Sequence, residues 1–476
     1  MIFSSITFLI YFLPIVLVLY LIIPNYIKNV FLLLVSILFY SWGGPKFIFI
    51  ILGTTALDFY LVQLMDNSAK EKTRKFFLIA SLTLNVGLLF YFKYCNFFID
   101  NLNSVFSFFS VGEIKWTKLM LPIGISFYTF ESLTYVVDVY RKEHKPLSNF
   151  LQYQLYILLF PKLIAGPIIR FSEISDQITG RFATYNVDMI LNGFCRFVIG
   201  LGKKVLIANV MAKIADQAFS VPVSLLSTYE CWIGALAYTF QIYFDFSGYS
   251  DMAIGLGKMF GFRFPENFNN PYSSKSITEF WRRWHMTLGK WMKNYLYIPL
   301  GGNRVGSNTR LYFNLWLVFI LSGFWHGASW TFIFWGVYYG FWLVLERIFL
   351  LEYLKKMRLF SCFITFIIVV IGWVFFRSDT IGGAFSFLSS MFKGSETASG
   401  NIVLDQKAKI IFVLSVFFSF FTLLPFGQKI QNFIYDNENK NAITYFSHII
   451  LCLGIFILSL ASITSSTFNP FIYFRF

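Results

Sequence analysis

The sequence predicts an all-α, polytopic transmembrane protein. Hydrophobic residues make up 57% of the 476 residues and charged residues only 13%, whereas soluble proteins carry about 25% charged residues. The mean hydropathy is +0.63. A spanning helix needs about 20 mostly apolar residues, and the apolar runs together with several weaker ones predict about ten to twelve crossings. The main runs are 6–23, 30–42, 47–64, 76–91, 311–344, 363–376, 410–424 and 449–461.

The first run and the basic loops predict the orientation. Run 6–23 is expected to be a retained helix, because no basic residue precedes it and no small-residue cleavage site ends it. The short loop 66–75 is rich in lysine and arginine, which predicts a cytoplasmic position. Runs 47–64 and 30–42 lie between Lys28 and this loop, so two crossings place Lys28 on the cytoplasmic side as well. Run 6–23 then places the N-terminus outside. Further cytoplasmic loops are expected at 141–145 and 355–358.

Charge and cysteine usage narrow the class of partner. The net charge of +15 fits positive loops facing anionic lipid headgroups. No soluble domain carries a basic face, so we expect the lipid bilayer as a partner and no nucleic acid. The five cysteines stand alone in mostly apolar sequence, which predicts neither a disulfide nor a metal site. A polar loop is expected at 393–401.

The hydropathy pattern breaks down in a central block, from about Tyr243 to Arg310. At the start of this block, Gln241 and Asp245 are four residues apart, so they are expected to lie on the same face of a helix. The proline- and asparagine-rich stretch 265–274 predicts an irregular turn region. After it, aromatic residues recur at helical spacing over 277–295, which predicts an amphipathic helix starting near Ser276 or Thr278.

The expected amphipathic helix combines tryptophans with basic side chains, namely Trp281, Arg282, Arg283 and Trp284. It is too charged to span, which favours an interfacial or re-entrant position. Two interpretations are open. These side chains anchor the helix at the interface, or they form a basic approach for a phosphorylated, ring-bearing ligand such as a nucleotide-containing thioester.

Two of the four histidines, His285 and His326, are the candidate catalytic residues. Histidine takes and returns a proton near neutral pH, and an ionisable group at membrane depth is costly enough to indicate function. His326 follows Trp325 and is expected in an embedded helix or at a break marked by Gly323 and Gly327. A lone membrane histidine also serves simply as a hydrogen bonder between helices.

The remaining motifs exclude several chemistries. His144 lies in a charged loop and is expected to be solvated, and His448 is expected to be structural. The patterns H-E-x-x-H and G-x-S-x-G are absent, which argues against a zinc hydrolase or a serine nucleophile.

Several blocks resemble the membrane-bound O-acyltransferase family, and most closely its bacterial alginate O-acetyltransferase branch. They are 243–255, 277–285, 295–304 and 324–327, with outlying matches at 121–130, 160–167, 373–377 and 470–476. Together they cover nearly the whole chain. One departure is Lys162, because the family more often has an uncharged residue after this proline.

The resemblance implies a single integral-membrane domain over 1–476, with N-terminal helices (1–120), a catalytic core (121–345) and C-terminal helices (346–476). It implies a ring of helices, with re-entrant or interfacial helices around a central tunnel. The family's membrane histidine corresponds to His326, and its second conserved polar position to His285. Relatives move an acyl group from a cytosolic donor, usually acetyl-CoA, to an acceptor outside, many with an extracytoplasmic SGNH-type partner.

This resemblance and the residue chemistry lead to one mechanism. A thioester is already activated, so deprotonating the acceptor hydroxyl and positioning the reactants are the main needs. We expect His326 to be the general base and His285 to position the donor or stabilise charge at its carbonyl. The expected substrate-contacting or supporting residues are Arg282 and Arg283 for donor phosphates, Trp281, Trp284 and Trp325, and Asp245 and Gln241 at the polar centre. The donor is expected as a substrate, and no bound cofactor or metal is expected.

Two alternatives are open. One is D-alanyl transfer to teichoic acid from a carrier protein. The other is a non-enzymatic polysaccharide exporter or flippase, since intramembrane polar residues suit transport as well. The expected location of the protein is the bacterial cytoplasmic membrane. The acceptor is also open between alginate, peptidoglycan, a secondary wall glycan and an exopolysaccharide.

Overall fold

The described part of the chain is helical throughout. The computed structural model describes residues 1–183, 185–357, 359–394, 402–435 and 442–465, together with Phe468 and Ile472. Every regular element in these ranges is a helix, as the sequence predicts. Most of the expected polar loop 393–401 and of the terminal motif 470–476 lies outside the described residues. The division into three parts stays a prediction.

The first four α-helices follow the N-terminal apolar runs, and α5 comes directly after them. They are α1 (Leu13–Ile22), α2 (Lys28–Ser41), α3 (Phe47–Asp66), α4 (Glu71–Leu89) and α5 (Cys95–Phe108). A π-helical segment, Phe90–Tyr94, joins α4 to α5, so that Glu71–Phe108 forms one continuous rod.

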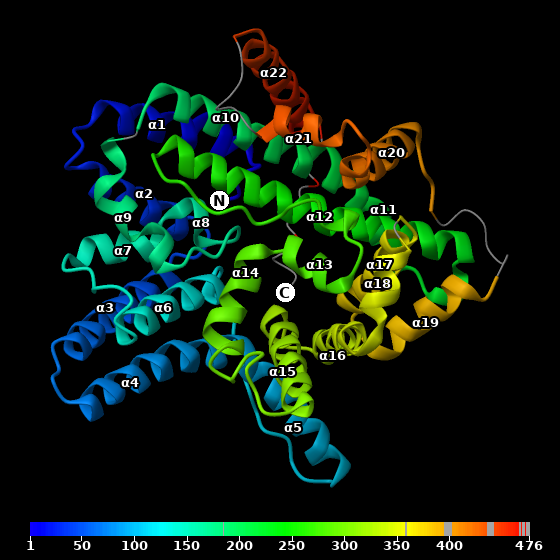
Figure 1. Cartoon of the computed structure of the whole chain (residues 1–476), viewed down its shortest axis with the longest axis horizontal. Helices are drawn as coiled ribbons and strands as arrows, with labels where there is room; N and C mark the ends of the chain where they lie inside the picture. Colours follow the sequence, from blue (N-terminus) through cyan, green and yellow to red (C-terminus); the bar gives the residue numbers. More distant parts are fainter. Residues whose placement is uncertain are drawn as a thin grey trace.

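The middle of the chain places short helices around one long one. Its helices are α6 (Ile125–Tyr140), α7 (Phe150–Leu158), α8 (Phe160–Leu163), α9 (Phe171–Gly180), α10 (Val187–Gly202), α11 (Asn209–Ser220) and α12 (Thr228–Met259). α12 has 32 residues and begins at a capping box formed by Ser227 and Glu230. It crosses the centre of the molecule beside α10 and α11 (Figure 1).

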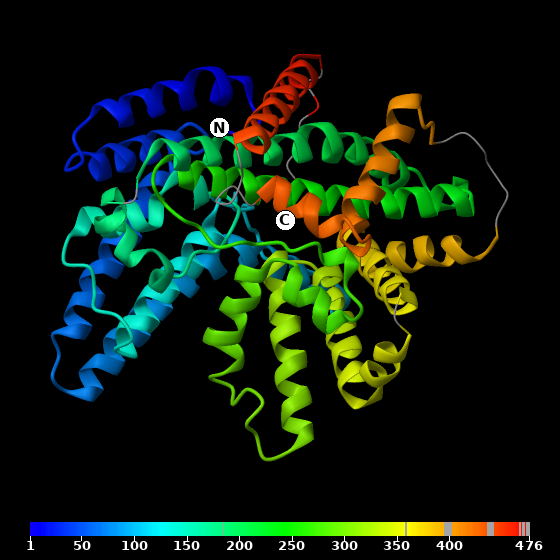
Figure 2. The same ribbon diagram turned by 45° about the horizontal axis from the view of Figure 1, so that its top comes forward.

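The remaining helices complete the surroundings of α12. They are α13 (Ile277–Arg283), α14 (Met286–Trp291), α15 (Asn308–His326), α16 (Trp330–Leu345), α17 (Leu351–Lys356), α18 (Leu359–Arg377), α19 (Ile381–Phe392), α20 (Gln406–Phe420), α21 (Gly427–Tyr435) and α22 (Ala442–Ser465). α15 and α16 form a closely packed hairpin below the centre of Figure 2. Other π-helical segments are Thr7–Phe12, Lys203–Ala208, Met292–Tyr297 and Glu346–Leu350, and 3₁₀ turns are Arg181–Ala183, Val223–Leu225, Pro271–Ser273 and Phe421–Leu423.

Six of the described helical stretches are long and apolar enough to cross a membrane. They are Phe47–Asp66, Glu71–Phe108, Trp330–Lys356, Phe360–Arg377, Gln406–Leu423 and Ile443–Ser465. Three shorter apolar helices are Thr7–Ile22, Lys28–Ser41 and Ile381–Phe392. Large side chains on the outer faces, such as Phe49 and Ile22, are exposed, as lipid-facing surfaces require. The expected count of ten to twelve crossings is larger than six and stays a prediction.

The amphipathic helix expected over 277–295 begins where the sequence predicts. The Ser276 side chain caps α13 by accepting a hydrogen bond from the Glu279 N–H at 3.0 Å. The helix is not continuous, however. α13 ends at Arg283, and His285 has a left-handed backbone with φ of 44° before α14 begins.

The break is stabilised by pairing with the irregular stretch before α13. Asn269 N donates to the Arg283 carbonyl at 2.9 Å, and Met286 N donates to the Asn267 carbonyl at 2.9 Å. These bonds satisfy backbone groups that an uninterrupted helix would have used internally. The prediction of one helix is therefore wrong, because the tertiary hydrogen bonds outweigh the helical periodicity.

α10 and α12 pack with their backbones in close contact through glycines spaced seven residues apart. A Cβ added at Gly200 would lie 2.4 Å from the Gly248 carbonyl oxygen, and one at Gly255 would lie 2.5 Å from the Gly193 carbonyl oxygen. Small residues allow this approach, which is a common basis of helix association in membranes. α12, which supplies residues to the site described below, is therefore held by a contact that tolerates no side chain.

We expect Gly200→Ala to lower the thermal stability of the detergent-solubilised protein. The added methyl group overlaps the α12 backbone, and such overpacking costs about 1–3 kcal/mol. The matched control is Gly53→Ala on α3, where a Cβ meets nothing within 4 Å and alanine favours the helix. Thermal melting monitored by size exclusion compares the two variants, and equal melting temperatures would contradict the packing argument.

Candidate active site

His326 is the last residue of α15 and lies at the break before α16. A Cβ at Gly323 would lie 2.2 Å from the Phe332 carbonyl oxygen, and one at Gly327 would lie 2.2 Å from the Phe332 ring. The two glycines therefore let α16 approach the end of α15. The expected break is found after His326, at Gly327, whereas Gly323 lies within α15.

The imidazole of His326 is surrounded by aromatic rings. Its centroid lies 4.9 Å from that of Trp325, 5.4 Å from Trp335 and 5.3 Å from Phe376. The side chain is buried, and none of the described residues forms a hydrogen bond with its ring nitrogens. Buried polar groups are normally paired, so this imidazole is available to a ligand.

Two cavities meet at His326. The larger cavity has a volume of about 280 Å³ and is lined by Lys93, Ile164, Trp325, His326 and residues 121–127. The small cavity has a volume of about 20 Å³ and is lined by Ile242, Phe246, Trp284, His326, Trp335, Trp373, Phe376 and Ile472. His326 is therefore placed to contact molecules that enter from either side.

Lys93 fixes the end of α15 at the larger cavity. Its ammonium lies 2.5 Å from the carbonyl oxygen of Trp325, 3.3 Å from that of His326 and 3.2 Å from Ser126 Oγ. The last carbonyls of a helix lack partners within it, and a basic side chain satisfies them well. Lys93, on the α4–α5 rod, thus links α15 to the first turn of α6.

His285 also lies near Trp325. Its ring centroid is 6.3 Å from that of Trp325 and 4.7 Å from that of Phe246. Its Nδ1 is 3.1 Å from Asn267 Oδ1. The two predicted histidines thus lie near the same indole ring, although 41 positions separate them in the sequence.

Asn267 holds the break that carries His285. Its Oδ1 also accepts from Thr287 Oγ1 at 2.9 Å, and its Nδ2 donates to Ser250 Oγ at 3.0 Å and to the Gly166 carbonyl at 3.3 Å. One buried amide therefore joins α12, the stretch after α8 and the backbone around His285. Sequence reasoning placed Asn267 in a turn and assigned it no role.

The other predicted residues differ in their distance from the cavities. Trp284 and Trp325 line them, and Trp281 packs on Trp335 with centroids 5.4 Å apart. Arg282 is exposed and lines neither cavity. Arg283 is held by an ion pair with Glu279 at 2.7 Å.

Asp245 and Gln241 lie on α12 as expected, but they have different surroundings. Asp245 pairs with Lys204 at 2.8 Å and accepts from the Ile472 N–H at 2.8 Å. Gln241 Oε1 is buried without a hydrogen-bond partner among the described residues. Asp245 thus fixes Ile472, whose side chain lines the small cavity.

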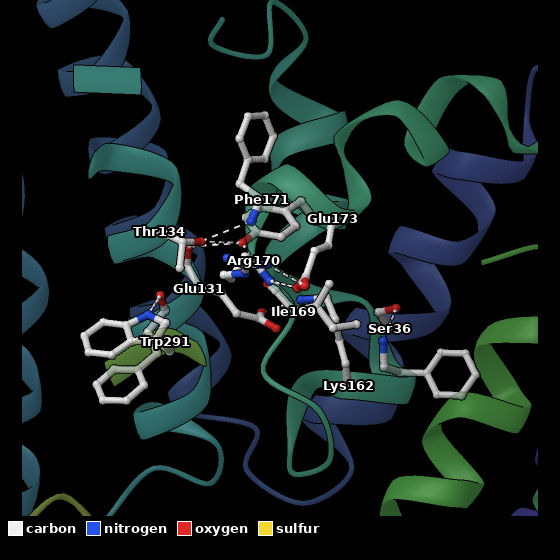
Figure 3. Close-up of polar contacts among 12 residues, drawn as sticks. Ser36, Glu131, Thr134, Lys162, Ile169, Arg170, Phe171, Glu173 and Trp291 are labelled. Carbon is white, nitrogen blue, oxygen red and sulfur yellow. Dashed lines mark hydrogen bonds and ion pairs between the residues drawn. The ribbon is translucent and has the colours of Figure 1, made fainter. Parts of the chain in front are cut away.

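Lys162, the charged departure from the family pattern, is matched by a partner. Its ammonium forms a fully buried ion pair with Glu131 of α6 (Figure 3). Trp291, from α14, approaches α6 on the side of Phe130, donating from Nε1 to the Phe130 carbonyl at 3.1 Å and stacking on the Phe130 ring at 3.8 Å. These contacts fix α6, whose first turn lines the larger cavity.

A group of side chains that could hold a metal ion lies away from both cavities. The ligand atoms of Cys195, His448 and Cys452 lie within 4.8 Å of one another, between α10 and α22. His448 is buried, with its Nε2 3.8 Å from Cys452 Sγ. The expectation that the chain uses no metal stays a prediction. His144 is half-buried beside Phe171 rather than fully solvated.

Several residues of this site were not predicted from the sequence. Lys93 carried a detectable signal, because a lysine that directly follows an apolar run is costly at membrane depth. Trp335 and Phe376 gave none, since aromatic residues in apolar helices are usual. Ile472 could be placed only through its contact with Asp245.

We expect Asn267→Ala to destabilise the protein by about 1–3 kcal/mol, because it leaves buried partners such as Thr287 Oγ1 without a hydrogen bond. The control is Asn269→Ala, whose side chain is exposed. Thermal melting of the two purified variants is the measurement. If both variants melt at the same temperature as the wild type, Asn267 does not stabilise the break between α13 and α14.

The chain is similar to proteins of one family over most of its length. A model of the membrane-bound O-acyltransferase family matches residues 104–380. A probable alginate O-acetylase of Pseudomonas aeruginosa is 45% identical over 82% of this chain and 75% of its own. A probable alginate O-acetylase of Pseudomonas putida is 38% identical over the full length of both chains. A peptidoglycan O-acetyltransferase of Helicobacter pylori is 37% identical over 82% of this chain and 80% of its own. The chain therefore belongs to the membrane-bound O-acyltransferase family.

Proposed function

We propose that this protein is an O-acetyltransferase that moves an acetyl group from cytosolic acetyl-CoA to a hydroxyl group of an extracytoplasmic polysaccharide. The observation that carries the proposal is His326, a buried imidazole that has no hydrogen-bond partner among the described residues and lines two cavities. The relatives matched over most of the chain are named for O-acetyl transfer, which supports this reaction.

The proposed reaction needs one base and two approaches. His326 takes the proton from the acceptor hydroxyl as its oxygen bonds to the acyl carbon. The carbon–sulfur bond of the thioester then breaks, and the proton passes to the leaving thiolate. General base catalysis of this kind contributes about 10²–10⁴-fold. A base that touches both cavities meets donor and acceptor without moving.

The basic loops support a direction for the two approaches. Loop 66–75 is cytoplasmic by its charge, and the rod starts there. Lys93 is 22 residues after Glu71, about 33 Å along a helix, and the hydrocarbon core is about 30 Å thick. The larger cavity, beside Lys93, is therefore assigned to the acceptor side. A ring of ten to twelve spanning helices around a tunnel through both cavities completes this proposal.

The remaining site residues take supporting roles in the proposal. His285, fixed by Asn267, stabilises charge at the thioester carbonyl. Arg282 is exposed and attracts donor phosphates, whereas Arg283 is engaged by Glu279. Trp281 and Trp284 form the aromatic wall beside the donor.

The proposed location is the bacterial cytoplasmic membrane, with an SGNH-type extracytoplasmic partner completing transfer to the polymer. Donor dependence separates this reaction from D-alanyl transfer, which requires an acylated carrier protein. Normal amounts of unacetylated polymer in a deletion strain separate it from polysaccharide export, whose loss removes the polymer.

Replacing His326 by alanine tests the proposed function. We expect acetyl transfer in membranes supplied with acetyl-CoA to fall by about 10²-fold or more, because the base is lost. His144→Ala, which changes a histidine outside both cavities, serves as the control. Retained transfer by His326→Ala at a normal protein level would exclude His326 as the base.

Lys93→Met tests the link between the rod and His326. The variant leaves the Trp325 and His326 carbonyls unpaired, so the imidazole loses its fixed position. We expect kcat for acetyl transfer to fall at least 10-fold, since small misplacements are costly, while KM for acetyl-CoA stays unchanged. Ser126→Ala removes only the hydroxyl that accepts a hydrogen bond from Lys93, so it should lower kcat less than Lys93→Met does. An unchanged kcat in Lys93→Met would show that the link does not position His326.

A further inference from the structure

The small cavity has the size and lining of a binding site for a very short acyl group. Its volume of about 20 Å³ exceeds the roughly 10–15 Å³ that one water needs, so it has room for a very small group only. The larger cavity, at about 280 Å³, has more than ten times this volume. The two sides of His326 therefore accept molecules of very different size.

The wall of the small cavity is apolar and rigid. Trp335 and Trp373 stack with centroids 6.1 Å apart, and Phe376 lies 5.2 Å from Trp335 and 5.4 Å from Trp373. Trp284 lies 4.8 Å from Trp373. Each of these four rings is buried and contacts at least one other of them, so none can move aside without disturbing its neighbours.

The same wall contains a polar group without a partner. Trp335 Nε1 is buried and forms no hydrogen bond with any described residue. Such a donor in a native core calls for an explanation. A thioester carbonyl oxygen is the kind of acceptor that it lacks, and the Trp335 ring lies beside His326, where the acyl carbon must react.

We propose that the small cavity holds the methyl group of the transferred acetyl and that its wall excludes longer acyl groups. This inference rests on the proposed function and goes beyond it, because it assigns the acyl selectivity to named side chains. Ile242 of α12 and Ile472 are the aliphatic members of the wall. Shortening either one makes room for further carbons without removing a ring.

The test compares acetyl and propionyl transfer in membranes that carry the full chain with its native acceptor. Membranes receive equal concentrations of acetyl-CoA and propionyl-CoA, and the esters formed on the acceptor are released by alkali and quantified by mass spectrometry. We expect Ile242→Ala to raise the propionyl-to-acetyl ratio by about 10-fold or more, the effect of one methylene in a fitted pocket.

The control is Ile254→Ala, the same change on the same helix at a buried position that lines neither cavity. Ile472→Ala changes the wall from another segment and is expected to raise the propionyl-to-acetyl ratio as well. The test therefore does not depend on the protein level of a single variant. An unchanged ratio in both cavity variants, or an equal rise in Ile254→Ala, would overturn the inference. Absence of acetyl transfer by the wild type would instead overturn the proposed function.

Discussion

The site depends on how the end of α15 is satisfied inside an apolar core. A helix that ends inside the protein leaves its last carbonyl groups without partners in the helix itself. Lys93 supplies the donors for the Trp325 and His326 carbonyls. This contact turns an unfavourable helix end into a fixed point. It acts through the backbone of His326 and leaves the ring nitrogens without a hydrogen bond from any described residue.

Buried polar groups elsewhere in the described chain follow the same principle across distant segments. Asp251 pairs with Arg196 and Lys203, both at 2.6 Å, and Glu131 pairs with Lys162. A buried charge without a partner is costly, so these pairs fix the relative positions of α6, α8, α10 and α12. Some buried polar atoms of the described chain, such as Gln241 Oε1 and Trp335 Nε1, also lack a hydrogen-bond partner, and His326 differs from them because it lines both cavities.

The sequence predicted the parts of the fold that depend on local composition. Apolar runs became helices, Ser276 capped α13, and Gly327 marked the break after His326. Those features arise from hydropathy and backbone freedom, which act over a few residues. The prediction of one continuous helix over 277–295 was wrong, because hydrogen bonds from residues outside this segment decide whether the helix continues.

The candidate site was less accessible to sequence reasoning for the same physical reason. His285 and His326 could be identified by their chemistry, since an ionisable group in apolar sequence is costly. Their common neighbour, the Trp325 ring, and the wall residues Trp335 and Ile472 are brought together by tertiary packing. Lys93 and His326 are 233 positions apart, and no local pattern relates them.

Both candidate histidines lie where a helix is interrupted, and this placement follows from the chemistry. Irregular backbone at membrane depth is tolerated only where it is buried in protein or lines a cavity. An interruption therefore marks a place where the protein can bring a polar side chain to a cavity, provided that other groups satisfy the freed backbone. Lys93 does this at His326, and the 267–269 stretch does so at His285. A substitution that restores continuous helix at either break would remove the need for these partners, but it would also rotate the imidazole away from the ring of Trp325, which both histidines now approach.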